Sequence, residues 1–362
     1  VAAATSVPRG LVLIDPNYEQ PSEWKIALGG TWDMPWYDMT LDFDYMHTKG
    51  VDPAYYVDVS QTIVGQTLAG SPIYDYYTED TFGTEARDNL MLTNSPYTPR
   101  SNMASFVLTK EWEFGLKAQL GYAWVEGEDV ASMVAATANS NFTGEALLDI
   151  NDPLPGNSNW VVPQRITLGL FYENNFFGDN PTRIALQGYI NEGQPQSYVM
   201  DSGDFEGDGF NGRHLLYVPT GLDDPNVNFR WDDRNSPNPT MQDDFFAFIA
   251  REGLQPGFQE RNARNTGWTN TWNLSVRQGF SLGDRVYGNL YFKIKNLGNL
   301  LNDDWGKVTD AQYFPREIIR DTDILSDGRI QFEEFSDESL QRTYVNPSLW
   351  EVRVGVDIGF GS

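Results

Sequence analysis

The sequence predicts an all-β protein and, more narrowly, a transmembrane antiparallel β-barrel with long extracellular loops. Two observations lead to this prediction. The strands alternate apolar and polar residues, and the links between strands alternate between very short and very long. Because successive side chains of a strand point to opposite faces, an alternating strand offers one face to hydrocarbon and the other to water. A barrel wall in an outer membrane has this property.

The last predicted strand, residues 348–360, shows the alternation most plainly. Every second residue from Trp350 to Phe360 is apolar, and charged residues or glycines lie between them. We expect the apolar set to face lipid and the polar set to face water.

Composition narrows the class of protein. The chain has 362 residues, a net charge of −26 and no cysteine. No apolar run approaches the roughly 18 residues of a transmembrane helix, and the mean hydropathy of −0.46 is compatible with a barrel because only half of each strand faces lipid. The missing cysteines exclude disulfide scaffolds and thiolate metal sites, and the acidity argues against nucleic acid as a partner.

Nine strands are predicted from the alternation, and they can be named by their ranges. The ranges are 23–34, 37–48, 103–114, 116–126, 164–173, 182–191, 268–281, 285–296 and 348–360. Tight links are expected around residues 35–36, 115, 176–178 and 283–284, whereas long inserts occupy about 49–102, 127–163, 193–266 and 297–347. All long inserts therefore fall on one side of the sheet, as in barrels with short periplasmic turns and long extracellular loops.

Aromatic residues sharpen the prediction because they gather near both ends of the strands. Membrane proteins concentrate aromatic side chains at the two interfaces of the bilayer. The tryptophans assigned to these interfaces are Trp24, Trp32, Trp36, Trp112, Trp124, Trp272 and Trp350. The competing interpretation is an aromatic core in a soluble β protein.

The direction of the strands leads us to expect strands beyond these nine. The first and last predicted strands run the same way, so they cannot pair antiparallel with each other. Unpaired backbone groups in lipid each cost several kcal/mol. We therefore expect at least one more strand upstream of residue 1, and residues 1–362 to be the C-terminal part of a larger barrel or one of two chains that complete it.

Several short motifs carry a resemblance to a known family. They are Ile14-Asp15-Pro16-Asn17, Gly207-Asp208-Gly209 with Leu215–Pro219, Glu260–Arg264, and Lys295–Asn302 with Asp304-Trp305-Gly306. Together with the closing strand they resemble the C-terminal barrel region of TonB-dependent outer-membrane transporters, specifically the Oar-like group.

The resemblance implies a location and a set of partners. The location would be the outer membrane of a Gram-negative bacterium, with the C-terminus in the periplasm. The whole barrel would have about 22 or more strands around a plug domain, and neither the plug nor the upstream strands lie in this chain. The partners would be the lipid bilayer, the inner-membrane TonB machinery and surface accessory proteins, and the function would be transport of a bulky substrate.

The closing strand also resembles the signal read by the outer-membrane assembly machinery. The residues that match are Arg353, Gly355, Ile358 and Phe360, and the departure from the pattern is that Gly361 and Ser362 follow Phe360.

Two acidic segments of the predicted extracellular loops are candidate calcium sites. Calcium is the one cofactor that the sequence suggests. Asp323, Asp327 and Glu334 match part of a calcium loop, although Leu325 stands where a ligand is needed. The alternative there is a strand–turn–strand hairpin with Ser326-Asp327-Gly328 as its turn. Asp204, Glu206 and Asp208 form the second segment, for which the alternative is a solvated loop.

No enzymatic activity is expected. The chain has two histidines, His47 and His214, and no Gly-x-Ser-x-Gly motif. The competing functions are a passive porin or a surface adhesin with a structural barrel, and a soluble calcium-dependent carbohydrate-binding β protein.

Overall fold

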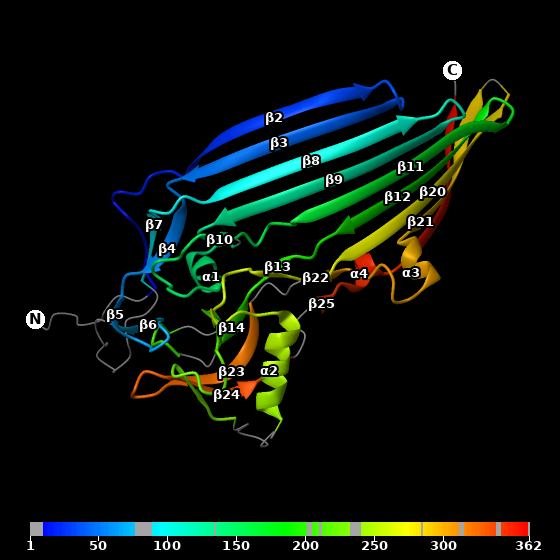
Figure 1. Ribbon diagram of the computed structural model, residues 1–362. Helices are drawn as coiled ribbons and strands as arrows, with labels where there is room; N and C mark the ends of the chain where they lie inside the picture. The colour runs from blue at the N-terminus through cyan, green and yellow to red at the C-terminus, as the bar shows by residue number, and fades with distance from the viewer. Residues whose placement is uncertain are drawn as a thin grey trace, which may run out of the picture.

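The structure, a computed structural model, describes residues 10–76, 89–133, 135–200, 205–209, 212–231, 240–283, 285–310, 315–337 and 342–360. Its main feature is one curved antiparallel sheet in which nine strands follow one another in chain order, with a two-residue tenth strand, β10 (Gly156–Asn157), paired at one end (Figure 1). The strands are β2 (Ser22–Met34), β3 (Met39–Val51), β8 (Arg100–Glu111), β9 (Leu116–Asp129), β11 (Gln164–Phe177), β12 (Asn180–Asn191), β20 (Thr269–Leu282), β21 (Val286–Lys295) and β26 (Glu351–Phe360). This confirms the all-β, antiparallel prediction.

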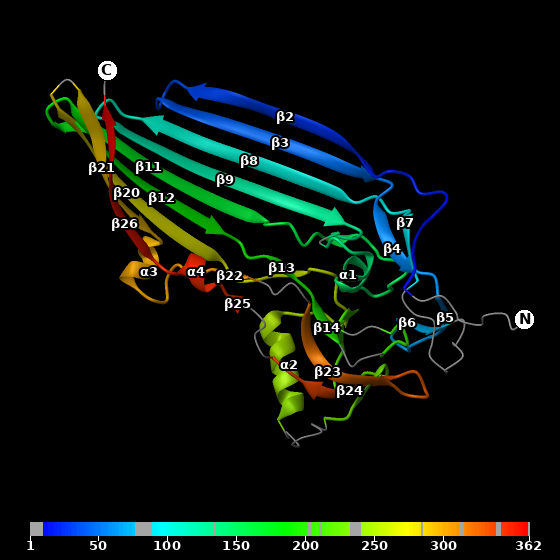
Figure 2. The ribbon, with the colours of Figure 1, turned by 180° about the vertical axis from the view of Figure 1, so that it is seen from behind.

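The tight links and the long links lie at opposite ends of this sheet. Both views place the β2–β3 and β8–β9 turns at the end where β26 finishes, and the long links at the other end (Figures 1 and 2). The tight turns use left-handed backbone, at Asp38 with φ 53° and at Gly115 with φ 92°. Glycine is required at the second position, because a Cβ on Gly115 would lie 2.0 Å from the carbonyl oxygen of Glu173.

The sheet is open in the described part of the chain. β2 pairs with β3 alone and β26 pairs with β21 alone. Because the nine strands alternate in direction, β2 and β26 run the same way, as the sequence predicted. No closed barrel is formed by these nine strands.

The four long links fold together into a second unit, here called the loop domain. Its main sheet has the order β15 (His214–Leu215), β14 (Tyr198–Met200), β23 (Arg316–Ile324), β24 (Ile330–Phe335), β17 (Val227–Phe229). Helix α2 (Met241–Glu252) packs on it through Phe245 and Phe248, which are fully buried. The helix ends at Gly253, whose left-handed conformation (φ 63°) suits glycine.

Shorter elements complete the long links and the segment before β2. The strands are β1 (Val12–Ile14), β4 (Ala54–Asp58), β5 (Gln61–Gln66), β6 (Pro72–Tyr76), β7 (Leu90–Asn94), β10 (Gly156–Asn157), β13 (Pro195–Gln196), β16 (Tyr217–Val218), β18 (Gly257–Phe258), β19 (Arg264–Asn265), β22 (Thr309–Asp310) and β25 (Arg342–Thr343). The helices are α1 (Ala138–Thr143), α3 (Leu297–Leu301) and α4 (Val345–Ser348). Within the described ranges, no helix is both long and apolar enough to cross a membrane.

Candidate functional site: the two faces of the main sheet

One face of the main sheet is apolar and exposed. Strand register places Phe43, Phe106, Tyr122, Ile166 and Ile190 in one row across five strands. Paired residues point to the same side, so the alternation of the sequence produces a continuous apolar surface. We call it the apolar face.

The described part of the chain leaves the apolar face uncovered. The exposed fraction is 76% for Val354 and 54% for both Leu290 and Ile358. Monomeric soluble proteins rarely expose contiguous apolar patches above a few hundred Å². This face extends over all nine strands.

Most of the assigned tryptophans lie toward the ends of strands. Trp36 lies in the β2–β3 turn and packs edge-on against Trp32, with ring centroids 5.8 Å apart. Trp112 lies in the β8–β9 turn beside Phe114, at 6.2 Å. At the long-link end, Trp24 is 74% exposed near the start of β2 and Trp350 is 46% exposed just before β26.

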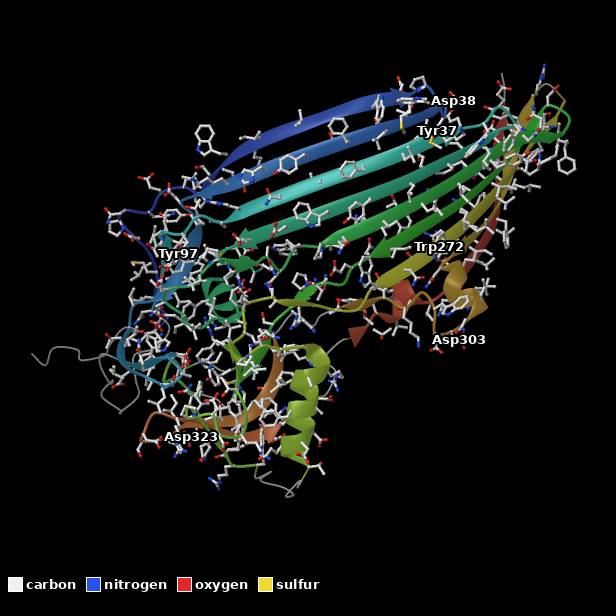
Figure 3. The ribbon with its side chains drawn as sticks, viewed as in Figure 1. Tyr37, Asp38, Tyr97, Trp272, Asp303 and Asp323 are labelled. Carbon is white, nitrogen blue, oxygen red and sulfur yellow. The ribbon has the colours of Figure 1, made fainter. Side chains whose placement is uncertain are left out.

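The two remaining tryptophans lie on the apolar face, inside the strands. Trp124 of β9 pairs with Ala104 and Gln164. Trp272, near the long-link end of β20 (Figure 3), covers Gly188, where a Cβ would lie 2.5 Å from its ring.

The opposite face of the sheet, the polar face, carries the charged residues. The row Asp44, Ser105, Ala123, Arg165 and Asn191 runs across five strands. Its β2–β3 part is acidic, and there Thr31 donates to Asp42 at 2.6 Å and Thr40 donates to Asp33 at 3.0 Å. Its part from β11 to β26 is basic.

The basic part of the polar face is hollowed to a volume of about 830 Å³. Six cationic and two anionic residues line it, namely Lys117, Arg183, Arg277, Lys293, Lys295, Arg353, Glu173 and Glu351. Both acids are already paired, because Arg183 contacts Glu173 at 2.7 Å and Arg353 contacts Glu351 at 2.5 Å. The hollow therefore keeps a positive excess in a strongly acidic chain.

The residues that resemble an assembly signal divide between the two faces of β26. Arg353 and Gly355 lie on the polar face, and Ile358 and Phe360 on the apolar face. Gly355 makes room for the Tyr291 side chain, since a Cβ there would lie 2.3 Å from the Tyr291 hydroxyl.

The structure does not bring Asp323, Asp327 and Glu334 together. β23 and β24 form the hairpin that was the alternative interpretation, with Asp323 opposite Gln331 and Glu334 opposite Arg320. The Asp327 carboxylate accepts from the backbone N–H and the Nε of Arg329, at 3.1 and 2.8 Å. Both carboxylate oxygens of Asp327 therefore accept hydrogen bonds from Arg329 within the same turn.

The second acidic segment is buried rather than solvated. Glu206 and Asp208 are 2% and 0% exposed, and Asp204 lies outside the described residues. His214 Nε2 lies 3.3 Å from Asp208 Oδ2 and 3.8 Å from Glu206 Oε2, and the buried Arg213 lies in the same electrostatic cluster. In the described part of the chain, no group of three or more His, Cys, Asp or Glu residues is placed to hold a metal ion.

Burial and neighbouring charges shift the pKa values of Glu206 and His214 in this cluster. Burial raises the pKa of Glu206 to about 7, against the opposing attraction of His214. The pKa of His214 is also raised: burial opposes its charging, but the hydrogen bond to Asp208 and the charges of Glu206 and Asp208 outweigh burial. The cluster is tied to β6 by the Tyr74 N–H, which donates to the Glu206 carbonyl at 2.7 Å.

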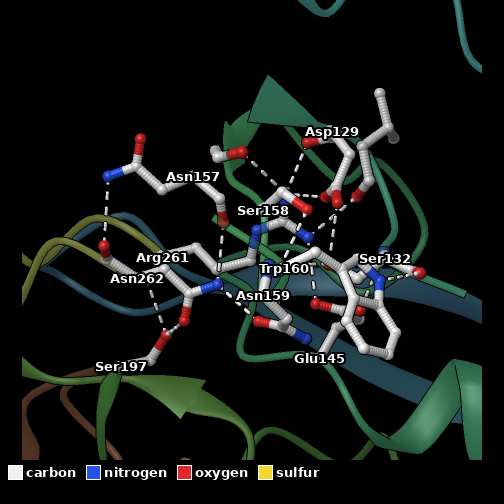
Figure 4. A network of polar contacts seen from close by, with 12 residues as sticks. Asp129, Ser132, Glu145, Asn157, Ser158, Asn159, Trp160, Ser197, Arg261 and Asn262 are labelled. Atoms are coloured by element: carbon white, nitrogen blue, oxygen red, sulfur yellow. Dashed lines mark hydrogen bonds and ion pairs between the residues drawn. The ribbon is translucent and has the colours of Figure 1, made fainter. Parts of the chain in front are cut away.

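A second buried network surrounds Arg261 (Figure 4). Its Nη1 contacts Glu145 Oε2 at 2.9 Å and its Nη2 contacts Asp129 Oδ1 at 2.6 Å. The neighbouring Asn262 donates from its backbone to Ser197 Oγ at 2.8 Å and from its amide to the Asn157 carbonyl at 2.7 Å. This network fastens the link after β9 to the link after β12.

Arg261 pairs with acids of the loop domain, whereas Arg264 donates to the Gly253 carbonyl at 2.9 Å. Sequence reasoning missed Arg213 and His214 as partners of the buried acids. The signal was present, because these two residues directly precede the apolar run Leu215–Val218, and a charge beside a buried run requires a partner.

Comparison with known proteins gives no match: no protein-family model, no curated protein and no solved structure corresponds to this chain.

Proposed function

We propose that the nine-stranded sheet is part of the wall of a transmembrane β-barrel in the outer membrane of a Gram-negative bacterium. The observation that carries the proposal is the exposed apolar face, which spans the sheet and has the alternation of a lipid-facing wall. In this arrangement the tight turns are periplasmic and the loop domain is extracellular.

The two unpaired edges of the sheet, at β2 and β26, support the proposal that the complete barrel contains further strands. An edge strand in lipid would leave its N–H and C=O groups without partners, which the hydrocarbon does not tolerate. β2 and β26 would therefore be joined by strands from elsewhere in the same protein or from a second chain.

By the resemblance of its motifs, we assign the barrel to a TonB-dependent, Oar-like transporter for a bulky substrate. The polar face would then line a lumen that holds water and a plug domain, and the loop domain would form the substrate vestibule. All four long links contribute to that vestibule. The Leu68 N–H donates to the Gly328 carbonyl at 2.8 Å, and Tyr76 donates to the Asp208 carbonyl at 2.7 Å.

The decisive experiment compares two neighbouring residues of β21 that point to opposite faces. Leu290 lies on the apolar face and Asn289, paired with Asp357, lies on the polar face. Leu290→Arg is expected to cost about 2–4 kcal/mol if the site is near the bilayer midplane, and Asn289→Arg is expected to cost little. The measurement is the yield of folded protein in an outer-membrane assembly assay.

Extraction provides the independent control. We expect the wild-type protein to remain in the membrane fraction until detergent is added. A protein that is soluble without detergent, or equal assembly of the two arginine variants, would remove the proposal.

A further inference from the structure

The hollow on the polar face contains cations in directly opposed positions of paired strands, which do not help to stabilise the sheet. Strand register places Arg183 directly opposite Arg277, and Lys293 directly opposite Arg353. Like charges in directly opposed positions of an antiparallel pair destabilise the sheet. Two such pairs occur on neighbouring strands, in a chain whose net charge is −26.

The acids of the hollow neutralise only one member of each pair, and Arg277 and Lys293 are the members left over. Glu173 is engaged by Arg183 and Glu351 by Arg353, and Lys117 pairs with Glu111, which lies beyond the hollow, at 2.7 Å. Among the described residues, Arg277 and Lys293 have no ion pair with a carboxylate, whereas Lys295 lies directly opposite Glu351, which Arg353 already contacts. Lys293 instead lies over the ring of Tyr291, with its Nζ 5.2 Å from the ring centroid.

The shape of the hollow suits a ligand. Its volume of about 830 Å³ falls within the range of small-molecule sites, about 300–1,000 Å³. The wall also offers polar neutral groups from Gln187, Asn273 and Ser275. Guanidinium and ammonium groups converging on one space are the usual partners of carboxylates and phosphates.

We propose that this hollow binds a multivalent anionic solute through its carboxylate or phosphate groups, with Arg277 and Lys293 as the principal contacts. The bound anion would relieve both like-charge pairs at once. The inference deepens the proposed function, because it rests on the polar face being a water-filled lumen and names the chemical class of a solute that enters it.

The test uses the full-length protein, purified in detergent and titrated by calorimetry with citrate and, separately, with tripolyphosphate. We expect one or both probes to bind, and the stronger probe identifies the anionic group. Arg277→Gln and Lys293→Gln should each weaken that binding about ten-fold, whereas Arg277→Lys, which keeps the charge, should weaken it less. Added salt should also weaken the binding.

Lys25→Gln is the matched control. Lys25 is also a cation on the polar face, but it lies on β2, away from the hollow, in a contact with Glu23 at 2.7 Å. Circular dichroism establishes that each variant is folded. Failure of both probes to bind the wild-type protein, or equal weakening by Lys25→Gln, would overturn the inference. The membrane-assembly comparison of Leu290→Arg with Asn289→Arg does not depend on anions. It therefore tests the barrel wall independently of the anion site, and a failure of one proposal can be told from a failure of the other.

Discussion

Arg261 and Glu145 form a buried ion pair, with 2.9 Å between Nη1 and Oε2, that joins two positions 116 residues apart. Both side chains are only 4% exposed. The pair therefore holds two long links of the loop domain together from the inside, in a region that sequence reasoning treated as separate inserts.

Removing one member of this pair should destabilise the loop domain. Arg261→Met leaves the Glu145 carboxylate buried without its cation, and breaking a buried pair in this way costs about 3–5 kcal/mol. Lys307→Met is the control, because Lys307 forms an exposed pair with Asp304 at 2.8 Å and such pairs contribute about 0–1 kcal/mol. Denaturant unfolding, followed by tryptophan fluorescence, measures both. Similar losses in the two variants would contradict the assignment.

The buried acid cluster predicts that the loop domain is more stable at mildly acidic pH than at pH 8. Because the pKa of Glu206 rises from 4.5 to about 7 on folding, the folded protein binds a proton that the unfolded chain has released in this range. The free energy of unfolding then falls as pH rises from about 4.5 to about 7, by up to about 3 kcal/mol. The raised pKa of His214 acts in the same direction, since its contribution is lost as pH rises through the folded value.

Unfolding measured between pH 5 and pH 8 tests this dependence, and Glu206→Gln isolates its source. The variant has no carboxyl at this position and should show a flatter profile than the wild-type protein. A wild-type protein that gains stability toward pH 8, or a variant with an unchanged slope, would refute the prediction.

Phe245 is expected to be the most sensitive position of the loop-domain core. Its ring is fully buried among Trp231, Phe332 and Phe335, with centroid distances of 5.6, 5.8 and 5.5 Å. Phe245→Ala should cost about 3–5 kcal/mol through lost contacts and the cavity that remains. Leu222→Ala, at a residue that is 57% exposed, should change stability by less than about 0.5 kcal/mol. Limited proteolysis of the loop domain compares the two, and equal resistance would argue against this core.

Gly115 and Gly178 offer a matched test of the tight turns. Both have positive φ, 92° and 63°, but only a Cβ on Gly115 would meet backbone, at Glu173. Gly178→Ala should carry backbone strain of about 1–3 kcal/mol, and Gly115→Ala should cost more because the clash forces β9 and β11 apart. Thermal unfolding in detergent ranks the variants, and the reverse order would contradict the register described here.

The strands of the main sheet could be predicted within a few residues because their signal is local. Alternation along 268–281, for example, determines both the strand observed at Thr269–Leu282 and the face of each residue. The turns were recognisable from Gly115 and Gly178 for the same reason.

The loop domain could not be predicted from such signals. Its strands β14 and β17 have three residues each and pair in parallel with β23 and β24, which come from a different link. Short buried strands have no alternation, and parallel partners lie far apart in the chain. The helix Met241–Glu252 does carry a local signal, because Phe245, Phe248 and Ile249 share one helical face.

For the proposed barrel, the shared direction of β2 and β26 decides whether the total number of strands is even or odd. Because β2 and β26 run the same way, a barrel that is antiparallel throughout needs an odd number of additional strands between them, whichever polypeptide supplies those strands. Added to nine, an odd number gives an even total, so a cylinder completed with one, three or thirteen strands is admissible. A second copy of this sheet in the same membrane orientation also adds an odd number, but its edge strands run the same way as β2 and β26, so both seams would have to pair in parallel.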